Sequence, residues 1–180
     1  MYTTLISVEQ LRSLMQSGQP LMVFDCSFAL MQPAAGEQQY REAHIPGAVY
    51  ANLDTALSAH GLPDASGKVQ VPPDAASGGR HPLPSREKFA LWLSSVGFAN
   101  DMQAVVYDRQ GANYCGRLWW MLKWAGHENV AVLDGGLRAG QAAGGATVSG
   151  EEPSHFQSNF MLTNTHASLV VTKTIADQLG

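Results

Sequence analysis

The stretch that decides the fold is Ala104-Val105-Val106-Tyr107-Asp108-Arg109-Gln110-Gly111-Ala112-Asn113-Tyr114-Cys115. Its first four residues are a short apolar run bounded by polar residues, which indicates a buried strand. Apolar residues recur at helical spacing from Cys115 onward, which predicts a helix. Residues 108–113 are therefore expected to form a tight loop between the carboxyl end of a strand and the start of a helix.

This loop is expected to hold negative charge at its centre. Where a buried strand passes into a helix, backbone N–H groups turn inward, and such a nest favours an anion. The side chain offered to the centre is the carboxylate of Asp108, the first loop residue. We therefore expect Asp108 to fill the nest and to hold the loop rigid.

The stretch resembles the active loop of the rhodanese-like sulfurtransferases. In that family the first loop residue is a nucleophilic cysteine and the fourth is a glycine. Gly111 matches the glycine, whereas Asp108 stands where the cysteine would be. This replacement, and the continuation Arg117-Leu118-Trp119-Trp120, resemble the non-catalytic amino-terminal domain of the two-domain thiosulfate and 3-mercaptopyruvate sulfurtransferases. The resemblance implies that this chain has no catalytic residue and a pseudo-active loop consisting of Asp108, Arg109, Gln110, Gly111, Ala112 and Asn113.

Two further motifs carry the same resemblance. Asp25 at the end of an apolar run, followed by His44-Ile45-Pro46-Gly47-Ala48, is similar to the first rhodanese signature. Leu133-Asp134-Gly135-Gly136 matches the family's turn before its last helix. The family usually has a tryptophan shortly after this turn, and Gly140 is found in that neighbourhood here. Together the motifs cover about residues 5–143.

Apolar runs and helical stripes alternate along the chain, which predicts an α/β fold with a parallel sheet. We expect a rhodanese-like, open sheet of about five strands with helices on both faces. No regular element is predicted for residues 26–43. Residues 58–84 are predicted to be a long irregular insertion, and loops of this length are usually functional or mobile. Strands are expected at residues 5–6, 21–24, 48–50, 104–107 and 130–133, and helices at residues 8–17, 86–96, 115–125 and after 135.

The expected domain organisation is a rhodanese-like domain at residues 1–145 and a linker from residue 146 that leads into a truncated second domain ending at Gly180. Residues 144–166 are polar and rich in turn formers, which is typical of a linker. Residues 170–176 repeat the pattern of residues 5–11, two apolar residues before a hydroxyl cap. The apolar side chains of the tail would lie along the first domain, stay exposed, or drive self-association through residues 150–180.

Composition and charge exclude several classes of protein. Hydrophobic residues make up 45% of the chain and charged residues 14%, which argues against disorder. A net charge of −4 with scattered basic residues indicates no nucleic-acid partner. No apolar run is long enough for a membrane span, and no secretory signal is visible. Two cysteines make no disulfide framework, so we expect reduced thiols and a cytoplasmic location.

Several side chains are candidates for a site. Cys26 follows a strand at the sheet edge where α/β proteins form sites, so it is expected to be more accessible than Cys115 on its apolar helical face. Either thiol is a low-ranked alternative nucleophile. Arg80 and His81 would lie on the substrate side or at a domain interface, or only in a plain loop. Arg117 would point toward Asp108 or a partner-domain carboxylate, or be locally paired.

His44 is expected to hydrogen-bond within its own turn rather than to act as a base. The histidines show no metal-ligand spacing, so neither a metal nor a cofactor is expected. The resemblance implies the amino-terminal, non-catalytic domain of a thiosulfate or 3-mercaptopyruvate sulfurtransferase. Its partners would be the second rhodanese domain of the same polypeptide and a small sulfur donor. The alternatives are a stand-alone, catalytically inactive module that binds or regulates a partner, and a single-domain enzyme that uses Cys26 or Cys115.

Overall fold

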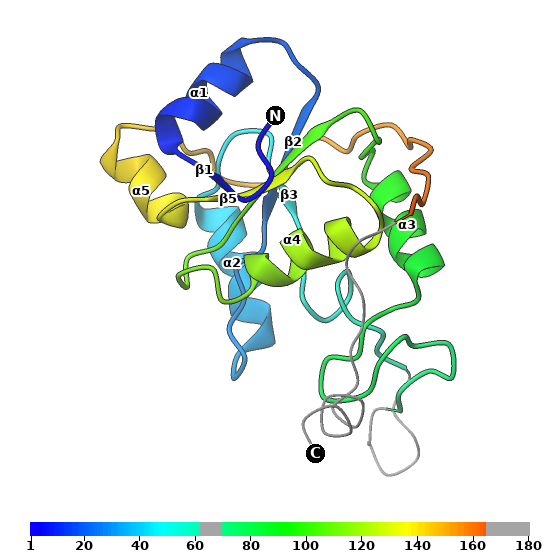
Figure 1. Ribbon diagram of the computed structural model, residues 1–180. Coiled ribbons are helices and arrows are strands. Elements are labelled where there is room, and N and C mark those ends of the chain that lie inside the picture. Colours follow the sequence, from blue (N-terminus) through cyan, green and yellow to red (C-terminus); the bar gives the residue numbers. More distant parts are fainter. Residues whose placement is uncertain (62–69, 165–180) are drawn as a thin grey trace, which may run out of the picture.

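A five-stranded parallel sheet forms the centre of the computed structural model, which describes residues 1–61 and 70–164 (Figure 1). The strand order is β1-β5-β4-β2-β3, so the chain crosses over between strands that are not neighbours in sequence. This arrangement confirms the predicted open parallel sheet. The strands are β1 (Leu5–Ile6), β2 (Leu21–Asp25), β3 (Val49–Tyr50), β4 (Gln103–Tyr107) and β5 (Val130–Leu133).

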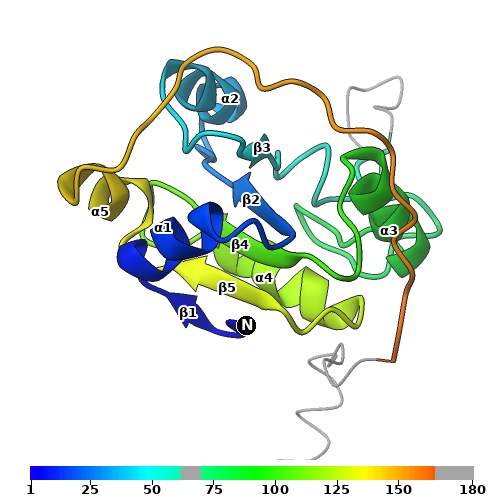
Figure 2. The ribbon, with the colours of Figure 1, turned by 90° about the horizontal axis from the view of Figure 1, so that it is seen from above.

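Helices cover both faces of the sheet (Figure 2). The side chains of β4 alternate between two cores, because successive residues of a strand point to opposite faces. Val106 packs with the side chains of α3 and α4, whereas Val105 packs with those of α1 and α5. The helices are α1 (Val8–Gln16), α2 (Pro33–Glu42), α3 (Arg86–Ser95), α4 (Cys115–Trp124) and α5 (Gly136–Ala142).

Helix α2 corrects the prediction of an irregular segment between residues 26 and 43. The helix begins with Pro33 at its first turn and buries only Gly36 and Tyr40, one turn apart. This apolar face is too narrow to show as a periodic stripe in the sequence. A side chain at Gly36 would collide with the carbonyl of Ser27, so the close approach of α2 to the end of β2 requires glycine.

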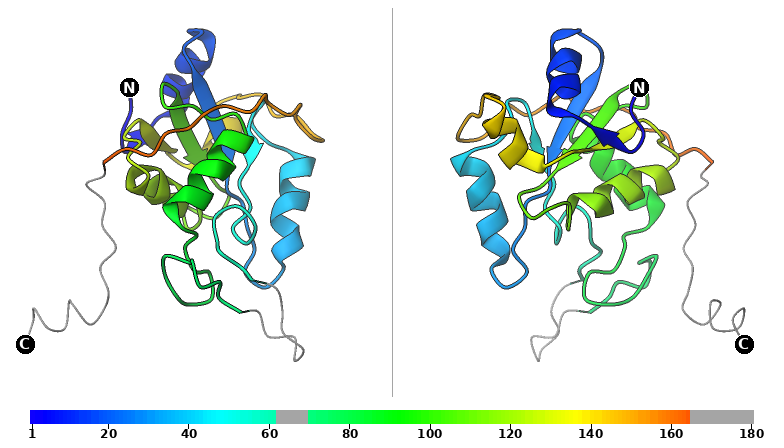
Figure 3. Two further views of the ribbon diagram at one scale, coloured as in Figure 1. Left: turned by 90° about the vertical axis from the view of Figure 1, so that its right-hand side faces the viewer. Right: turned by 60° about the vertical axis from the view of Figure 1, so that its left-hand side comes forward.

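The segment from residue 146 to residue 164, named here the docked linker, lies along the domain (Figure 3). Val148 exchanges two backbone hydrogen bonds with His44, with N–O distances of 2.9 and 3.0 Å. Further along, Phe160 is 5% exposed and its ring lies 5.7 Å from that of Phe98. The predicted boundary at residue 145 stays a prediction. The predicted start of a second domain lies mostly in residues 165–180, outside the described residues.

Two glycines at the ends of helices also allow the docked linker to pack closely against the domain. Gly97 has a φ of +82°, and a Cβ there would lie 2.6 Å from Cβ of His155. Gly126 has a φ of +91°, and a Cβ there would collide with Thr163. Left-handed backbone favours glycine at such ends, and the lack of a side chain lets the linker approach. Among the described residues, no helix combines the length and apolar composition that crossing a membrane requires.

We predict that the docked linker contributes to the stability of the domain through Phe160. Phe160→Ala should lower the free energy of unfolding by about 3 kcal/mol, because it removes a buried aromatic ring. Phe156→Ala is the matched control, since that side chain is 98% exposed, and it should change stability little. Urea denaturation of both variants measures the difference. Equal stabilities would show that the linker is not part of the folded unit.

Candidate functional site

The Asp108 loop, residues 108–113, lies at the carboxyl ends of the parallel strands, between β4 and α4. Its centre is the carboxylate of Asp108, which is 2% exposed. Oδ1 accepts hydrogen bonds from the N–H groups of Gln110 and Ala112, both at 2.9 Å. Oδ2 accepts from those of Tyr114 and Cys115, at 2.8 and 3.0 Å. The inward turn of backbone N–H groups expected from the sequence is therefore present, and one carboxylate uses four of the donors.

Two successive left-handed residues shape the loop around Asp108. Gly111 has a φ of +72° and Ala112 a φ of +69°, and Ala112 is the single non-glycine residue with positive φ in the described chain. This conformation is costly for alanine and persists only where the surroundings impose it. Here the hydrogen bond from the Ala112 N–H to Asp108 imposes it. Since two donors also come from the start of α4, the helix dipole favours the same negative charge.

Arg109 points out of the nest and connects three segments. Its Nη1 lies 2.9 Å from Oδ2 of Asp25 and 2.5 Å from Oγ of Ser27. Its Nη2 donates to the carbonyls of Gln39, at 3.0 Å, and Ala43. The sequence analysis placed Arg109 in the loop but missed this pairing with a fully buried carboxylate. Asp25 at the end of an apolar run was the available signal, because buried carboxylates need a partner.

The two cysteines are equally inaccessible, at 1% exposure each. The expectation that Cys26 would be the more accessible thiol is wrong, because the chain after β2 turns into the core rather than into an open cleft. Burial raises the pKa of Cys26, with the negative charges of Asp25 and Asp108 acting in the same direction. Burial also raises the pKa of Cys115, as does Asp108. Neither thiol is therefore poised as a nucleophile, which needs the thiolate form.

Arg117 is locally paired and does not reach Asp108. Its Nε and Nη2 donate to the carbonyl of Leu57 at 3.0 and 2.8 Å, and Nη2 also donates to the carbonyl of His81 at 2.9 Å. Of the alternatives expected from the sequence, local pairing is therefore confirmed and pairing with Asp108 is wrong, because the guanidinium group is held by these carbonyls. Arg117 instead fastens the two ends of the insertion at residues 58–84 to α4.

His81 is connected to the start of α4 through the ring of Phe28. Its ring is 6.2 Å from that of Phe28, which in turn lies 5.5 Å from that of Tyr114 at the start of α4. Asp54 approaches Nδ1 of His81 to 3.1 Å. Arg80 is exposed and donates to the carbonyl of Leu30 at 3.3 Å. The insertion thus brings Arg80 and His81 to the carboxyl end of the sheet, together with Asp54, which sequence reasoning did not identify.

His44 has a structural role close to the expected one. Its ring is buried, and Nδ1 lies 2.7 Å from the carbonyl oxygen of Tyr40, within the same local segment. The contact that sequence reasoning missed is Glu152 of the docked linker, whose Oε1 lies 3.3 Å from Nε2 and accepts from the N–H of Gly47 at 2.6 Å. His44 therefore ties the linker to the domain.

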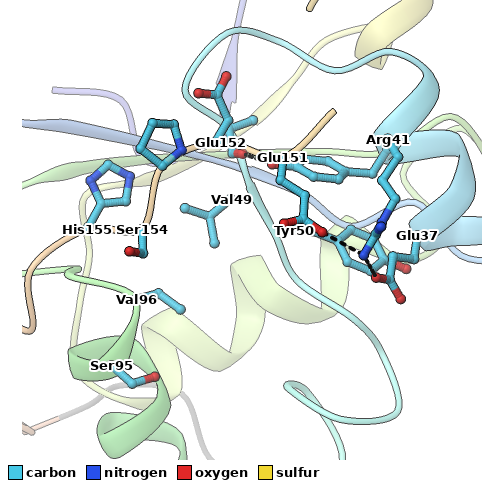
Figure 4. A pocket seen from close by; sticks show the side chains of 13 residues that line it. Glu37, Arg41, Val49, Tyr50, Ser95, Val96, Glu151, Glu152, Ser154 and His155 are labelled. Carbon is cyan, nitrogen blue, oxygen red and sulfur yellow. Dashed lines mark hydrogen bonds and ion pairs between the residues drawn. The ribbon is translucent and has the colours of Figure 1, made fainter. Parts of the chain in front are cut away.

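A cavity of about 310 Å³ lies between α2, α3 and the docked linker, on elements other than the Asp108 loop (Figure 4). Its charged wall is formed by Arg41, which contacts Glu37 and Glu151 at 2.8 Å each. These charges satisfy one another, and the linker itself forms one side. The cavity is therefore separate from the candidate site.

These features define the class of protein: a parallel α/β domain with a helix-capping, anion-binding loop at the carboxyl edge of its sheet. The sequence profile of the Rhodanese-like domain matches residues 7–143, so the chain belongs to this family. A probable 3-mercaptopyruvate sulfurtransferase of Pseudomonas aeruginosa is 39% identical over 98% of the chain and 57% of the relative. A putative thiosulfate sulfurtransferase, SseB, of Mycobacterium tuberculosis is 35% identical over 82% of the chain and 47% of the relative.

Solved structures show the same fold. The 3-mercaptopyruvate sulfurtransferase from Leishmania major superposes with a TM-score of 0.68 at 27% identity, over 94% of this chain and 42% of that one. SseA from Escherichia coli superposes with a TM-score of 0.74 at 22% identity, over 97% of this chain and 61% of that one. The chain spans about half the length of the curated relatives it matches. It aligns with the amino-terminal portion of longer proteins.

Replacement of Asp108 tests the nest. Asp108→Ala should lower the free energy of unfolding by about 2 kcal/mol, because it removes the acceptor of four backbone N–H groups, of which that of Cys115 is buried. Asp108→Asn should also lower the free energy of unfolding, because the NH₂ group of the asparagine amide would face two backbone N–H groups that need an acceptor. Thermal and urea unfolding measure both variants. An unchanged midpoint for Asp108→Ala would mean that the carboxylate does not organise the loop.

Replacement of Arg109 tests the connection to Asp25. Arg109→Ala should cost about 3 kcal/mol of stability, because it leaves a buried carboxylate unpaired. Arg138→Ala, an exposed arginine on α5, is the matched control and should stay within about 0.5 kcal/mol of the parent. Urea denaturation compares them. Equal effects of the two replacements would contradict a bracing role for Arg109.

Proposed function

We propose that this chain is the amino-terminal, non-catalytic domain of a two-domain thiosulfate or 3-mercaptopyruvate sulfurtransferase. The observation that carries the proposal is the buried carboxylate of Asp108 on four N–H groups, at the loop position where the family has its cysteine. Two curated relatives bear these two activities in their names and are about twice as long as the matched region.

The chemistry of sulfur transfer supports a non-catalytic role. The nucleophile must attack a sulfane sulfur and then hold it as a persulfide, which a thiolate does and a carboxylate does not. Cys26 and Cys115 are buried in the core, so they offer no replacement nucleophile. The catalytic cysteine would therefore belong to a second rhodanese domain of the same polypeptide. That cysteine would take the sulfur from a small sulfur donor.

This domain would support the catalytic half and close one side of its cleft. Arg80 and His81 would form part of that side, since both lie at the carboxyl end of the sheet near the Asp108 loop. The docked linker would lead from this domain to the second one. A cytoplasmic location, and self-association through residues 150–180 when the second domain is missing, belong to the same proposal.

An activity assay tests the proposal. The purified 180-residue chain should produce no thiocyanate from thiosulfate and cyanide, and no sulfide from 3-mercaptopyruvate and a thiol. The chain extended by its downstream reading frame should have one of these activities, lost when a cysteine of that extension is replaced. A stop codon directly after Gly180 would favour the stand-alone inactive module. Turnover by the 180-residue chain that is abolished in Cys26→Ser or Cys115→Ser would refute the proposal.

A further inference from the structure

Asp54, which precedes the insertion, converges beside the sheet edge with two side chains of the insertion, His60 and His81. Oδ1 of Asp54 lies 3.1 Å from Nδ1 of His81 and 3.5 Å from Nε2 of His60. The three atoms all lie within 4.8 Å of one another. Their separation in the sequence, at positions 54, 60 and 81, hides the cluster from any motif search. The sequence shows no metal-ligand spacing among the histidines, and the juxtaposition of these three side chains arises only in the folded chain.

The backbone that carries these side chains is held by independent contacts. The Asn52 side chain accepts a hydrogen bond from the N–H of Asp54 at 2.8 Å. The N–H of Ala59 donates to the carbonyl of Pro82 at 2.8 Å, which joins the two sides of the insertion. Arg117 binds the carbonyl of His81. The backbone on both sides of the cluster is thus held by contacts other than those among the three side chains.

Within this cluster the ring of His81 is left without hydrogen bonds in the part of the chain that the structure describes. Both ring nitrogens of His81 are buried and have no hydrogen-bond partner among the described residues, although Asp54 is 3.1 Å away. The close approach therefore lacks the alignment of a hydrogen bond. A buried polar atom without a partner is costly and points to a water or an ion at that place.

We propose that Asp54, His60 and His81 bind one divalent transition-metal ion, Zn²⁺ in particular, with a fourth coordination position left open. Two imidazole nitrogens and one carboxylate oxygen are a donor set that suits zinc and not magnesium or calcium. In a tetrahedral site with zinc–ligand bonds of about 2.0–2.1 Å, neighbouring donor atoms lie about 3.3 Å apart. The separations of 3.1 and 3.5 Å bracket this value.

The charges around the cluster set its affinity. Burial lowers the pKa of His81; Asp54 opposes this shift, and the positive charges of His60, Arg117 and Arg80 add to it. The same guanidinium groups disfavour a divalent cation, so we expect micromolar binding rather than the tight binding of a closed structural site. This inference does not depend on the proposed function.

Metal titration tests the proposal. The untagged 180-residue chain, freed of metal with a chelator, should bind one Zn²⁺ by calorimetry near pH 7. Co²⁺ should give the visible d–d absorption of a tetrahedral nitrogen- and oxygen-ligated ion. No thiolate charge-transfer band should appear, since both cysteines are buried elsewhere in the core. Zn²⁺ should also raise the melting temperature.

Variants assign the ligands. His60→Ala and His81→Ala should each weaken Zn²⁺ binding by at least about tenfold. That is the smaller loss of metal affinity found when residues that support metal ligands are replaced. His155→Ala, an exposed histidine on the docked linker, should bind like the parent. His60 is on the surface, so its variant keeps the test valid even if His81→Ala unfolds. Absent binding at millimolar Zn²⁺, or binding unchanged in His60→Ala, would overturn the proposal.

Discussion

The hydrogen bonding of the Asp108 carboxylate to the backbone is the interaction on which the rest of this structure depends. Four backbone N–H groups at the junction of β4 and α4, the centre of the sheet's carboxyl edge, share this carboxylate as their acceptor. The carboxylate satisfies them, fixes Ala112 in a left-handed conformation and caps α4. At this point of the fold the protein supplies a carboxylate from its own chain as the acceptor.

The rigid loop has consequences on both sides. Arg109 extends from it to the buried Asp25, so the ends of β2 and β4 and the end of α2 are held together by one guanidinium group. Arg117, on the first turn of α4, fastens the insertion through the carbonyls of Leu57 and His81. Helix α4 therefore positions both the Asp108 loop and the cluster of Asp54, His60 and His81. The loop and the cluster together give the domain an ordered polar surface at the carboxyl edge of the sheet, where α/β proteins form sites.

The docked linker packs on the part of the chain that matches the family profile. Its backbone pairs with His44, and Phe160 joins the core beside Phe98. The chain can pass so close because Gly97 and Gly126 have no side chains. Since a linker that packs on one domain restricts where the next one can lie, this segment would limit how a second domain is placed.

Local chemistry in the sequence determined the strands, most helices and the nest, because apolar periodicity, capping residues and the strand–loop–helix order depend on neighbouring residues. The motifs around Asp25, Asp108 and Gly135 also determined the family. Only the tertiary structure decided the pairing of Arg109, the burial of Cys26 and the convergence of His60 with His81. Such contacts join residues far apart in sequence, and they depend on how loops without periodic patterns are folded against the sheet. Helix α2 belongs with them, because its narrow buried face is defined by what it packs against.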